Sequence, residues 1–277
     1  MAEFSRTLAH LLGAALGVFG VGHLGRAVGA GLIQNGFPIS RLLVCHGGAP
    51  ETAARLAEEG LSERVVPAGD LTRRSKIILY LVRPQNANAI ESCELMDNAL
   101  VVSFLAGTPL ARIPARMVNG TRARVMTSAP DTLVKGKAIG AVYPPGNPVV
   151  EELLRALRVE QILLDKESDM HAFTAIGVCL PIVLACWRAQ GSTVDEKELI
   201  RAARKHHLES FEKILQWAHE AEPRFQTKTE EEAYMNRAAT PGGVTEAMIE
   251  RVKAGGSFTE ALESGIHRSK VLSGESA

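Results

Sequence analysis

The sequence lacks an excess of charge of either sign: 31 basic and 31 acidic residues give a formal net charge of zero. Proteins that bind nucleic acids depend on surplus Lys and Arg to neutralise phosphates, so the composition offers no electrostatic case for such a partner. Long hydrophobic runs are also missing, and no stretch of the sequence reaches the length of a membrane-spanning helix. We therefore expect no membrane partner either.

Cysteine is scarce and scattered. The four cysteines form no C-x-x-C pair, and no Cys/His cluster has the spacing of metal ligands. They are Cys45, Cys93, Cys179 and Cys186. We expect reduced, mostly buried thiols in a cytoplasmic protein, and no metal site.

The hydrophobic segment from Leu8 to Phe19 follows Arg6 and superficially resembles the core of a secretory signal. It continues without a break into a glycine-rich turn. We interpret its second half as the first buried strand, and residues 1–13 as an N-terminal extension.

At 277 residues and 46% hydrophobic content, the chain can bury a substantial core, and we expect two domains. In the first half, short hydrophobic runs alternate with amphipathic stretches, a pattern typical of a doubly wound parallel sheet with helices on both faces. Strands are predicted over Ala15–Phe19, Arg41–Cys45, Ile77–Val82, Leu100–Phe104 and Arg124–Met126, with Gly140–Tyr143 joining the edge. Helices are predicted over Gly25–Asn35, Glu51–Glu59 and Pro148–Leu157.

From about Asp165 onward, strand signals disappear and helical ones dominate. We expect one or two helices over residues 194–222 and another over 245–255, which ends on paired glycines. The predicted fold class is thus α/β: a Rossmann-like dinucleotide-binding domain over residues 1–165, followed by an all-helical domain over 166–277.

The strongest motif of the first half is Gly20-Val21-Gly22-His23-Leu24-Gly25. In a dinucleotide-binding turn, the first glycine permits the tight turn, the second lets a pyrophosphate approach the backbone, and the third lets helix and strand pack closely. The alternative is a tight turn that binds nothing. The motif follows a hydrophobic strand and opens a helix, which is the context that cofactor binding requires.

A second motif, Ala239-Thr240-Pro241-Gly242-Gly243-Val244-Thr245, lies more than two hundred residues downstream. It feeds a helix start and offers two glycines, two hydroxyls and unpaired N–H groups, which suit a small carboxylate. The structural alternative is helix capping, because Thr is a favoured N-cap residue and Pro-Gly-Gly commonly interrupts helices.

Both motifs resemble those of pyrroline-5-carboxylate reductase, the enzyme family that makes proline by reducing a cyclic imine. The resemblance covers nearly the whole chain and is most specific in the late Pro-Gly-Gly-x-Thr loop with the glycine pair that follows it. Its further elements are Ala30-Gly31-Leu32, Leu81-Val82-Arg83-Pro84-Gln85, Val101–Gly107, Arg124-Val125-Met126 and Gly255-Gly256.

The resemblance and the glycine turn together imply a set of cofactor-binding residues. They are Gly20, Gly22, His23, Leu24, Gly25, His46, Gly47, Val82, Arg83, Pro84, Ala106 and Gly107. A site for NAD normally has an acid at the end of the second strand, and none precedes Glu51 here. The family's usual Asn-Arg is missing there as well. His46, the Gly47-Gly48 backbone and Arg55 could meet a 2′-phosphate, so we expect NADP, with NAD as the alternative.

The resemblance also implies the substrate site. Thr245 would be the catalytic residue, as a hydrogen-bond donor to the imine nitrogen. Thr240, Gly242 and Gly243 would hold the carboxylate, and Cys179 would line the pocket. The chain departs from the family where Gly177-Val178-Cys179-Leu180 replaces Ser-Gly-Ser-Gly, and where Thr127-Ser128 replaces Pro-Asn. These changes make the pocket more apolar, which leaves the identity of the imine open.

The predicted function is NAD(P)H-dependent reduction of a small cyclic imino acid, pyrroline-5-carboxylate or a close analogue. The alternative is a paralogue that kept the nucleotide site, lost turnover and acts by binding. The resemblance further implies a homodimer or higher homo-oligomer, joined through the C-terminal helices. We expect the adjacent His206 and His207 to lie on a solvated helix face, and His171 to form a cap or a salt bridge.

Overall fold

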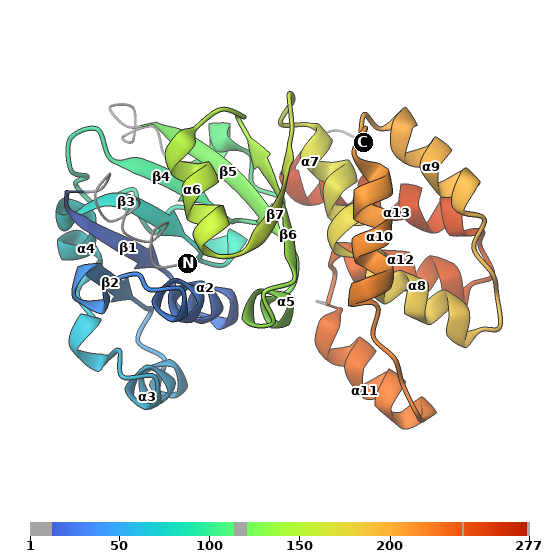
Figure 1. Cartoon of the computed structure of the whole chain (residues 1–277), viewed down its shortest axis with the longest axis horizontal. Coiled ribbons are helices and arrows are strands. Elements are labelled where there is room, and N and C mark those ends of the chain that lie inside the picture. Colours follow the sequence, from blue (N-terminus) through green and yellow to red (C-terminus); the bar gives the residue numbers. More distant parts are fainter. Residues whose placement is uncertain (1–12, 114–120, 240, 276–277) are drawn as a thin grey trace. The chain divides into compact units, whose positions relative to one another are not determined.

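The computed structural model describes residues 13–113, 121–239 and 241–275. The chain divides into two compact units, the first ending at Leu163 and the second beginning at Leu164. The first unit contains every strand of the sheet, and the described part of the second is helical (Figure 1). The predicted fold class is therefore confirmed.

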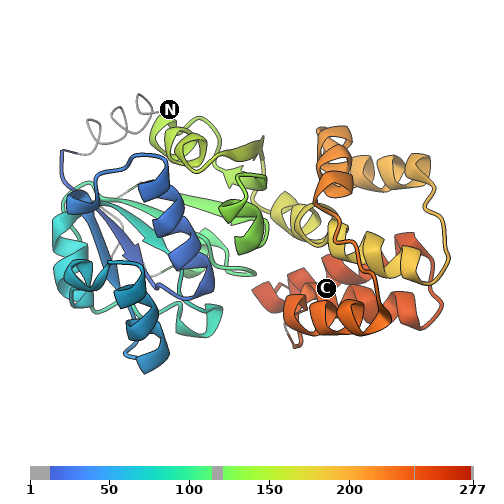
Figure 2. The ribbon, with the colours of Figure 1, turned by 60° about the horizontal axis from the view of Figure 1, so that its bottom comes forward.

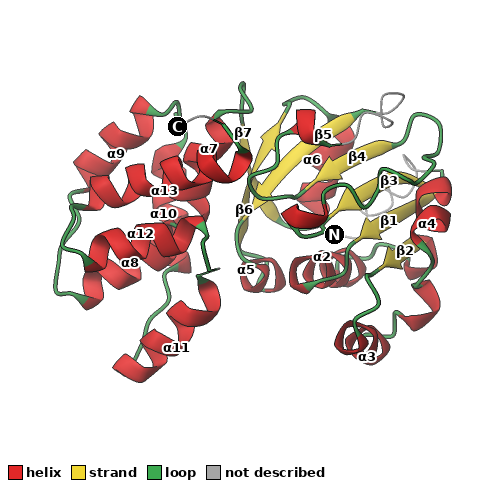
Figure 3. Ribbon diagram, turned by 180° about the vertical axis from the view of Figure 1, so that it is seen from behind, coloured by secondary structure: helices red, strands yellow, loops and turns green. Residues whose placement is uncertain are grey.

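The first unit is built on one continuous seven-stranded sheet with the order β2-β1-β3-β4-β5-β6-β7 (Figure 3). Neighbouring strands are parallel, except that β5 and β6 are antiparallel. The strands are β1 (Ala15–Phe19), β2 (Leu42–Cys45), β3 (Ser75–Tyr80), β4 (Leu100–Ser103), β5 (Arg122–Thr127), β6 (Ala138–Tyr143) and β7 (Val159–Leu163). The chain moves from β1 outward to β2 and then returns to the other side of β1 as β3. This reversal makes a topological switch point, where ligands of α/β proteins bind at the carboxyl ends of the strands.

The edge of the sheet differs from the sequence prediction. We expected Gly140–Tyr143 to join the edge, but β6 lies inside the sheet because β7 pairs with it in parallel. The sequence of β7 is Val-Glu-Gln-Ile-Leu, with Val159 and Ile162 buried and Leu163 51% exposed. Its mixed polar and apolar residues, typical of a strand covered on one face, produced no hydrophobic run that sequence analysis could detect.

Helices and loops cover both faces of the sheet. One buried cluster joins β-strand side chains to α2 (His23–Gln34), α3 (Pro50–Glu58), α5 (Pro130–Val134) and α6 (Pro148–Ala156). The cluster on the other face includes Leu71 of α4 (Ala68–Arg74) and side chains from the segment between β3 and β5. The short helices α4 and α5 were not predicted, because seven and five residues are too few for a clear helical period.

The helices of the second unit pack on one another, with α8 in contact with α10 and α12, and α13 in contact with α7, α9 and α12 (Figures 1 and 2). They are α7 (Asp169–Ala172), α8 (Leu180–Ala189), α9 (Glu196–Lys205), α10 (Phe211–Ala221), α11 (Lys228–Ala238), α12 (Val244–Lys253) and α13 (Phe258–Ser273), with a π-helical segment over Phe173–Val178. Two helices occupy the stretch 194–222, as one of the two expected arrangements had it. The long helix α13, which packs along α12, was not among the predicted elements.

The π-helical segment introduces a bend between α7 and α8. Asp169–Val178 and Leu180–Ala189 meet at 45°. The Cys179 N–H donates to the carbonyl of Thr174, five residues back, and Pro181 occupies the first turn of α8, where a missing N–H costs no hydrogen bond. In the described part of the chain, no single helix is long and apolar enough to cross a membrane. The two helices on either side of this bend have the length and apolar composition of a membrane span only when they are counted together.

Candidate functional site

The glycine turn joins β1 to α2 at the switch point of the sheet. Gly20 donates its N–H to the carbonyl of Cys45 at the end of β2, across 3.1 Å. On the other side, the Leu81 N–H donates to the carbonyl of Phe19 across 2.8 Å. The turn is thus held between the carboxyl ends of β2 and β3, where the fold places nucleotides.

Each of the three glycines meets a different physical requirement. Gly20 has φ +102°, and a Cβ there would lie 2.8 Å from the backbone of Leu81 and Val82. A Cβ on Gly25 would lie 2.1 Å from the carbonyl oxygen of Gly20, so only glycine allows helix and turn to pack this closely. A Cβ on Gly22 would meet nothing within 4 Å.

Gly22 is thus the open position of the turn. It is the N-cap of α2, it is exposed, and no side chain caps the helix there. The space beside its Cα and the first N–H groups of α2 together form a cradle that suits a phosphate. His23 begins the helix and is exposed, whereas the side chain of Leu24 packs on the hydrophobic core.

The residues after β2 offer a neutral hydrogen-bonding group instead of an acid. The Gly48 N–H donates to Nδ1 of His46 across 3.1 Å. A neutral ring that accepts at Nδ1 carries its hydrogen on Nε2, which is left as a donor. Gly47, which follows the strand, is exposed, and so is Arg55 on α3.

The remaining predicted cofactor residues follow β3 and β4. Val82 is half-buried, Arg83 is exposed, and Pro84 opens a short 3₁₀ turn whose Asn86 N–H donates to the carbonyl of Arg83. Beyond β4, Ala106 is exposed and Gly107 turns the chain with φ +63°.

In the second unit, Thr245 and Cys179 lie in direct contact. The Thr245 hydroxyl donates to Sγ of Cys179 across 3.2 Å. The N-cap of α12 is Gly243, and no side chain caps this helix, so the hydroxyl of Thr245 is not a helix cap. The capping interpretation of Thr245 is therefore wrong, because its hydroxyl is directed to the π-helical segment and α8 instead.

Cys179 is 4% exposed, and burial raises the pKa of its thiol to about 11, although the Thr245 hydrogen bond acts in the opposite direction. The thiol is therefore neutral near pH 7. A neutral sulfur is a weak acceptor, so it directs the Thr245 hydroxyl without binding it tightly.

The backbone of Gly242 is held by two charged side chains that sequence analysis missed. Its N–H donates to Oε2 of Glu246 across 2.6 Å, and its carbonyl accepts from Nε of Arg268 across 2.7 Å. The predicted Gly242 donor is thus already engaged by a carboxylate. Gly243 is half-buried at the helix start, and Thr240 lies outside the described residues. Arg268 is 26 residues from Gly242, so no local motif could have identified it.

Two residues at the departures noted above, Gly177 and Ser128, make structural contacts in this chain. A Cβ on Gly177 would lie 3.0 Å from the ring of Phe173, so glycine allows the π-helical segment to pack. Ser128 accepts the N–H of Ile139 across 3.1 Å, and its hydroxyl lies 2.7 Å from that of Thr132. Ser128 therefore links β5, α5 and β6.

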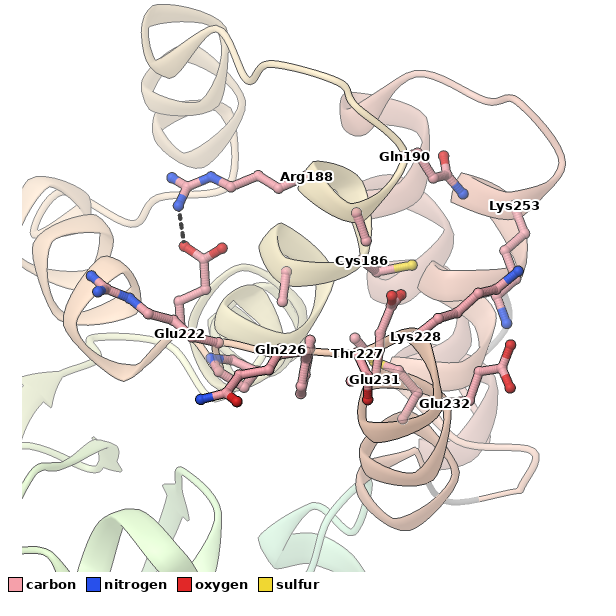
Figure 4. Close-up of a pocket in the computed structure, with 16 residues that line it drawn as sticks. Cys186, Arg188, Gln190, Glu222, Gln226, Thr227, Lys228, Glu231, Glu232 and Lys253 are labelled. Atoms are coloured by element: carbon pink, nitrogen blue, oxygen red, sulfur yellow. Dashed lines mark hydrogen bonds and ion pairs between the residues drawn. The ribbon is translucent and has the colours of Figure 1, made fainter.

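The described part of each unit contains a cavity. One, of about 340 Å³, lies between α2 and α5 and includes His23 and Arg26 among its lining residues. A larger one, of about 1080 Å³, lies in the second unit between α8, α11 and the segment that joins α10 to α11 (Figure 4). An Arg188–Glu222 ion pair of 2.6 Å lies on its wall. None of the predicted site residues lines this larger cavity.

Histidine positions show no metal-binding arrangement. Among residues 13–113, 121–239 and 241–275, no group of three His, Cys, Asp or Glu side chains could hold a metal ion. His171 is 2% exposed and lies between Ser269, 2.9 Å from Nδ1, and Glu275, 3.1 Å from Nε2. His206 contacts Glu263 across 3.0 Å. Hydrogen bonding from His206 and Lys205 outweighs burial and lowers the pKa of the Glu263 carboxyl.

Comparison with known proteins agrees with this architecture. Residues 15–107 match the family described as NADP oxidoreductase coenzyme F420-dependent. A pyrroline-5-carboxylate reductase of Methanosarcina acetivorans is 27% identical over 152 residues, which are 52% of this chain and 54% of that protein. The chain therefore spans about half the length of this curated relative.

Solved structures share the fold at low sequence identity. A pyrroline-5-carboxylate reductase from Coxiella burnetii has a TM-score of 0.58 and 16% identity, with 94% of this chain and 98% of that chain covered. The enzyme from Streptococcus pyogenes gives 0.56 and 15%, covering 93% and 98%. That from Plasmodium falciparum, solved with NADP bound, gives 0.53 and 17%, covering 94% and 98%.

The class of protein is thus a Rossmann-like dinucleotide-binding fold followed by a helical domain. Within it, the chain is similar to pyrroline-5-carboxylate reductases, in part of its sequence and in the fold of nearly its whole length.

Proposed function

We propose that this protein is an NAD(P)H-dependent reductase of a small cyclic imino acid, with pyrroline-5-carboxylate or a close analogue as substrate. The observation that carries the proposal is the geometry of the glycine turn. Gly20 and Gly25 are required by close backbone contacts, whereas the space beside Gly22 is open. A turn that only had to fold would not need glycine at that open position.

The residues of the first unit fit a dinucleotide. Gly22 and the first N–H groups of α2 would hold the pyrophosphate, because unpaired N–H groups at a helix start favour anions. NADP is the proposed cofactor, since no carboxylate follows β2 directly, the Nε2 donor of His46 is available there, and the helix that follows carries the exposed Arg55. A positively charged arginine and an imidazole N–H donor, with no carboxylate directly after the strand, suit a 2′-phosphate better than a bare ribose diol.

The residues of the second unit fit an imine substrate. When bound, a reduced nicotinamide supplies the hydride for the C=N carbon. Thr245 would orient the imine nitrogen through its hydroxyl, which Cys179 already holds in one direction. A cyclic imine that is protonated in water needs no separate general base, so the chain has to supply orientation and a hydrogen bond. Gly242 and Gly243 belong to the loop that would hold the carboxylate.

The chemistry of the helical segment bears on which imine is turned over. Cys179 and Leu180 take positions where the family has a hydroxyl and a glycine, and both side chains are buried. Pyrroline-5-carboxylate is the default substrate, and a pyrroline with an additional apolar substituent is the close competitor.

We further propose a cytoplasmic homo-oligomer joined through the C-terminal helices. Two adjacent hydrophobic side chains of α13, Val271 and Leu272, are 41% and 44% exposed in the single chain. Their burial against a second copy would remove apolar surface from water. All four cysteines are free thiols, as expected in a reducing compartment.

Oxidation of NADPH in the presence of pyrroline-5-carboxylate tests the proposed reaction, with NADH in parallel to establish the cofactor. Turnover that requires both the imine and the reduced nucleotide supports it. Tight NADPH binding without turnover of any pyrroline supports the non-catalytic alternative instead.

A further inference from the structure

Both backbone polar groups of Gly242 are bound by side chains of opposite charge. Glu246, from the first turn of α12, accepts the N–H across 2.6 Å, and Nε of Arg268, from α13, donates to the carbonyl across 2.7 Å. A carboxylate oxygen of this chain therefore already occupies the donor that a substrate carboxylate would use. The structure thus shows that this backbone N–H accommodates a carboxylate.

Arg268 lies closely against the same glycine. A Cβ at position 242 would lie 3.2 Å from a terminal nitrogen of the guanidinium, and Gly242 has φ +69°. Arginine has five N–H donors in a planar fork, and the hydrogen bond to the Gly242 carbonyl uses only the one on Nε. Its terminal N–H groups match the two oxygens of a carboxylate, a geometry that Lys cannot reproduce.

We propose that Arg268 determines the specificity of the site for acids, and that Glu246 is the anion a substrate displaces. In the free protein, Glu246 accepts the Gly242 N–H, and Arg268 donates to the carbonyl of the same residue. A substrate carboxylate takes that position and pairs with the terminal N–H groups of Arg268, while Glu246 turns to solvent. This inference rests on the proposed function, because it assigns the partner of the substrate carboxylate in that same site.

The exchange explains how acids are selected over uncharged rings. One carboxylate replaces another at the Gly242 N–H, so this donor has an anionic partner in both states, and the guanidinium gains one when the substrate binds. An uncharged imine offers no such replacement, and its binding would leave Glu246 in place. The charge of Glu246 therefore competes with every carboxylate ligand and weakens its binding.

Calorimetric titration with L-proline tests the exchange without turnover, and pyrrolidine, which lacks the carboxylate, is the matched control ligand. Arg268→Gln should weaken proline binding about tenfold or more, as expected for loss of a charge-assisted hydrogen bond. Arg268→Lys should restore part of it. Glu246→Gln keeps an oxygen for the Gly242 N–H, removes the competing charge and should tighten proline binding. None of the three variants should change the binding of pyrrolidine.

A merely structural role for Arg268 predicts a different pattern. In that case Arg268→Gln would lower the melting temperature and weaken the binding of proline and of pyrrolidine alike. Arg268→Lys would not restore the binding of either. Unchanged proline affinity in Arg268→Gln overturns the inference, as does the absence of proline binding by the wild type. If Arg268→Gln fails to fold, Glu246→Gln decides, since weaker or equal proline binding in that variant contradicts the exchange.

The test of the acid site and the test of the proposed reaction can give independent results. Proline binding that depends on Arg268, in a protein that reduces no pyrroline, supports the acid site and refutes the reductase. Turnover of pyrroline-5-carboxylate with KM and kcat that do not respond to Arg268→Gln supports the reductase and refutes the acid site. A rise in KM with little change in kcat supports both.

Discussion

The hydroxyl of Thr245 donates a hydrogen bond to Sγ of Cys179 across 3.2 Å, although the two residues are 66 positions apart in the sequence. The contact joins the first turn of α12 to the bend before α8. Burial keeps the thiol neutral by raising its pKa to about 11, so the sulfur acts as a weak acceptor that orients the hydroxyl. The hydroxyl remains available to a stronger partner, such as the nitrogen of a bound imine.

Removal of this hydroxyl should affect turnover more than folding. A preorganised hydrogen bond to the reacting group typically stabilises a transition state by about 2–4 kcal/mol. Thr245→Ala should therefore lower kcat/KM by roughly one to three orders of magnitude. The melting temperature should change little, because Gly243 and not Thr245 is the N-cap of α12.

Thr245→Ser is the control, since it keeps the hydroxyl and should retain much of the activity. Steady-state kinetics and thermal melts of both variants give the answer. Near-normal turnover in Thr245→Ala, together with early melting, would show a purely structural residue.

Substitutions of two glycines in the same turn should have different effects, one on nucleotide binding and the other on stability. Gly22→Ala places its Cβ in open space and should fold normally, but it should weaken NADPH binding because the methyl group enters the proposed phosphate cradle. Gly25→Ala forces a Cβ to within 2.1 Å of the Gly20 carbonyl oxygen and should destabilise the first unit.

Thermal unfolding measures the stability of each variant, and calorimetry with NADPH measures binding. A Gly22→Ala protein with wild-type affinity for NADPH would remove the glycine turn from the nucleotide site. A stable Gly25→Ala protein would contradict the close packing of helix and turn.

The cysteines should differ in reactivity. Thiolates react with iodoacetamide, and burial raises the pKa of Cys45 and Cys179 to about 11. Cys93 is partly exposed and should be alkylated ahead of both at about pH 8 in the folded protein. Peptide mass spectrometry over time gives the order, and a denatured sample, in which all four should react, is the control.

The raised pKa of Cys179 also predicts that the folded protein loses stability at alkaline pH. Because the folded pKa of Cys179 exceeds its ordinary value of 9.0, this thiol contributes stability below that pH and loses the contribution as the pH rises toward 11. Cys179→Ala should remove this part of the pH dependence in urea unfolding measured across the range. An unchanged slope would contradict the deep burial of the thiol.

The capping box at the start of α13 should contribute to stability. Ser257 accepts the N–H of Glu260, and the Glu260 carboxylate accepts the N–H of Ser257. Ser257→Ala should cost about 1 kcal/mol. The backbone N–H of Ser257, followed by Arg251, lowers the pKa of Glu260, so its contribution is present above its ordinary value and is lost as the pH falls.

Urea unfolding of Ser257→Ala and Glu260→Gln at neutral and acidic pH checks this. Both variants should be less stable than the wild type at neutral pH, and the deficit of Glu260→Gln should shrink in acid. A Glu260→Gln deficit that is the same at both values would contradict the role of the carboxylate.

The fold could be predicted largely from the sequence because its central strands are buried on both faces and therefore form continuous hydrophobic runs. The edge strand β7 has polar Glu160 and Gln161 between apolar ends, so it gave no such run. Helix α13 escaped prediction although Ser257 and Glu260 have the spacing of a capping box, a local signal that was available.

The site was predictable only where its residues are local. The glycine turn is a continuous motif whose spacing reflects steric contacts, and these contacts are present at Gly20 and Gly25. Arg268 and Glu246 could not be placed beside Gly242 from spacing alone. The contact of Arg268 arises from the packing of α13 against α12, and that of Glu246 from the left-handed conformation of Gly242.

The proposed reaction is tested most directly by proline formation from pyrroline-5-carboxylate by the purified protein with NADPH, followed as matched loss of NADPH and appearance of product. We expect one proline for each NADPH consumed, and activity that falls steeply in Thr245→Ala and returns in Thr245→Ser. Binding of NADPH without proline formation, from this imine or any substituted pyrroline, would contradict it.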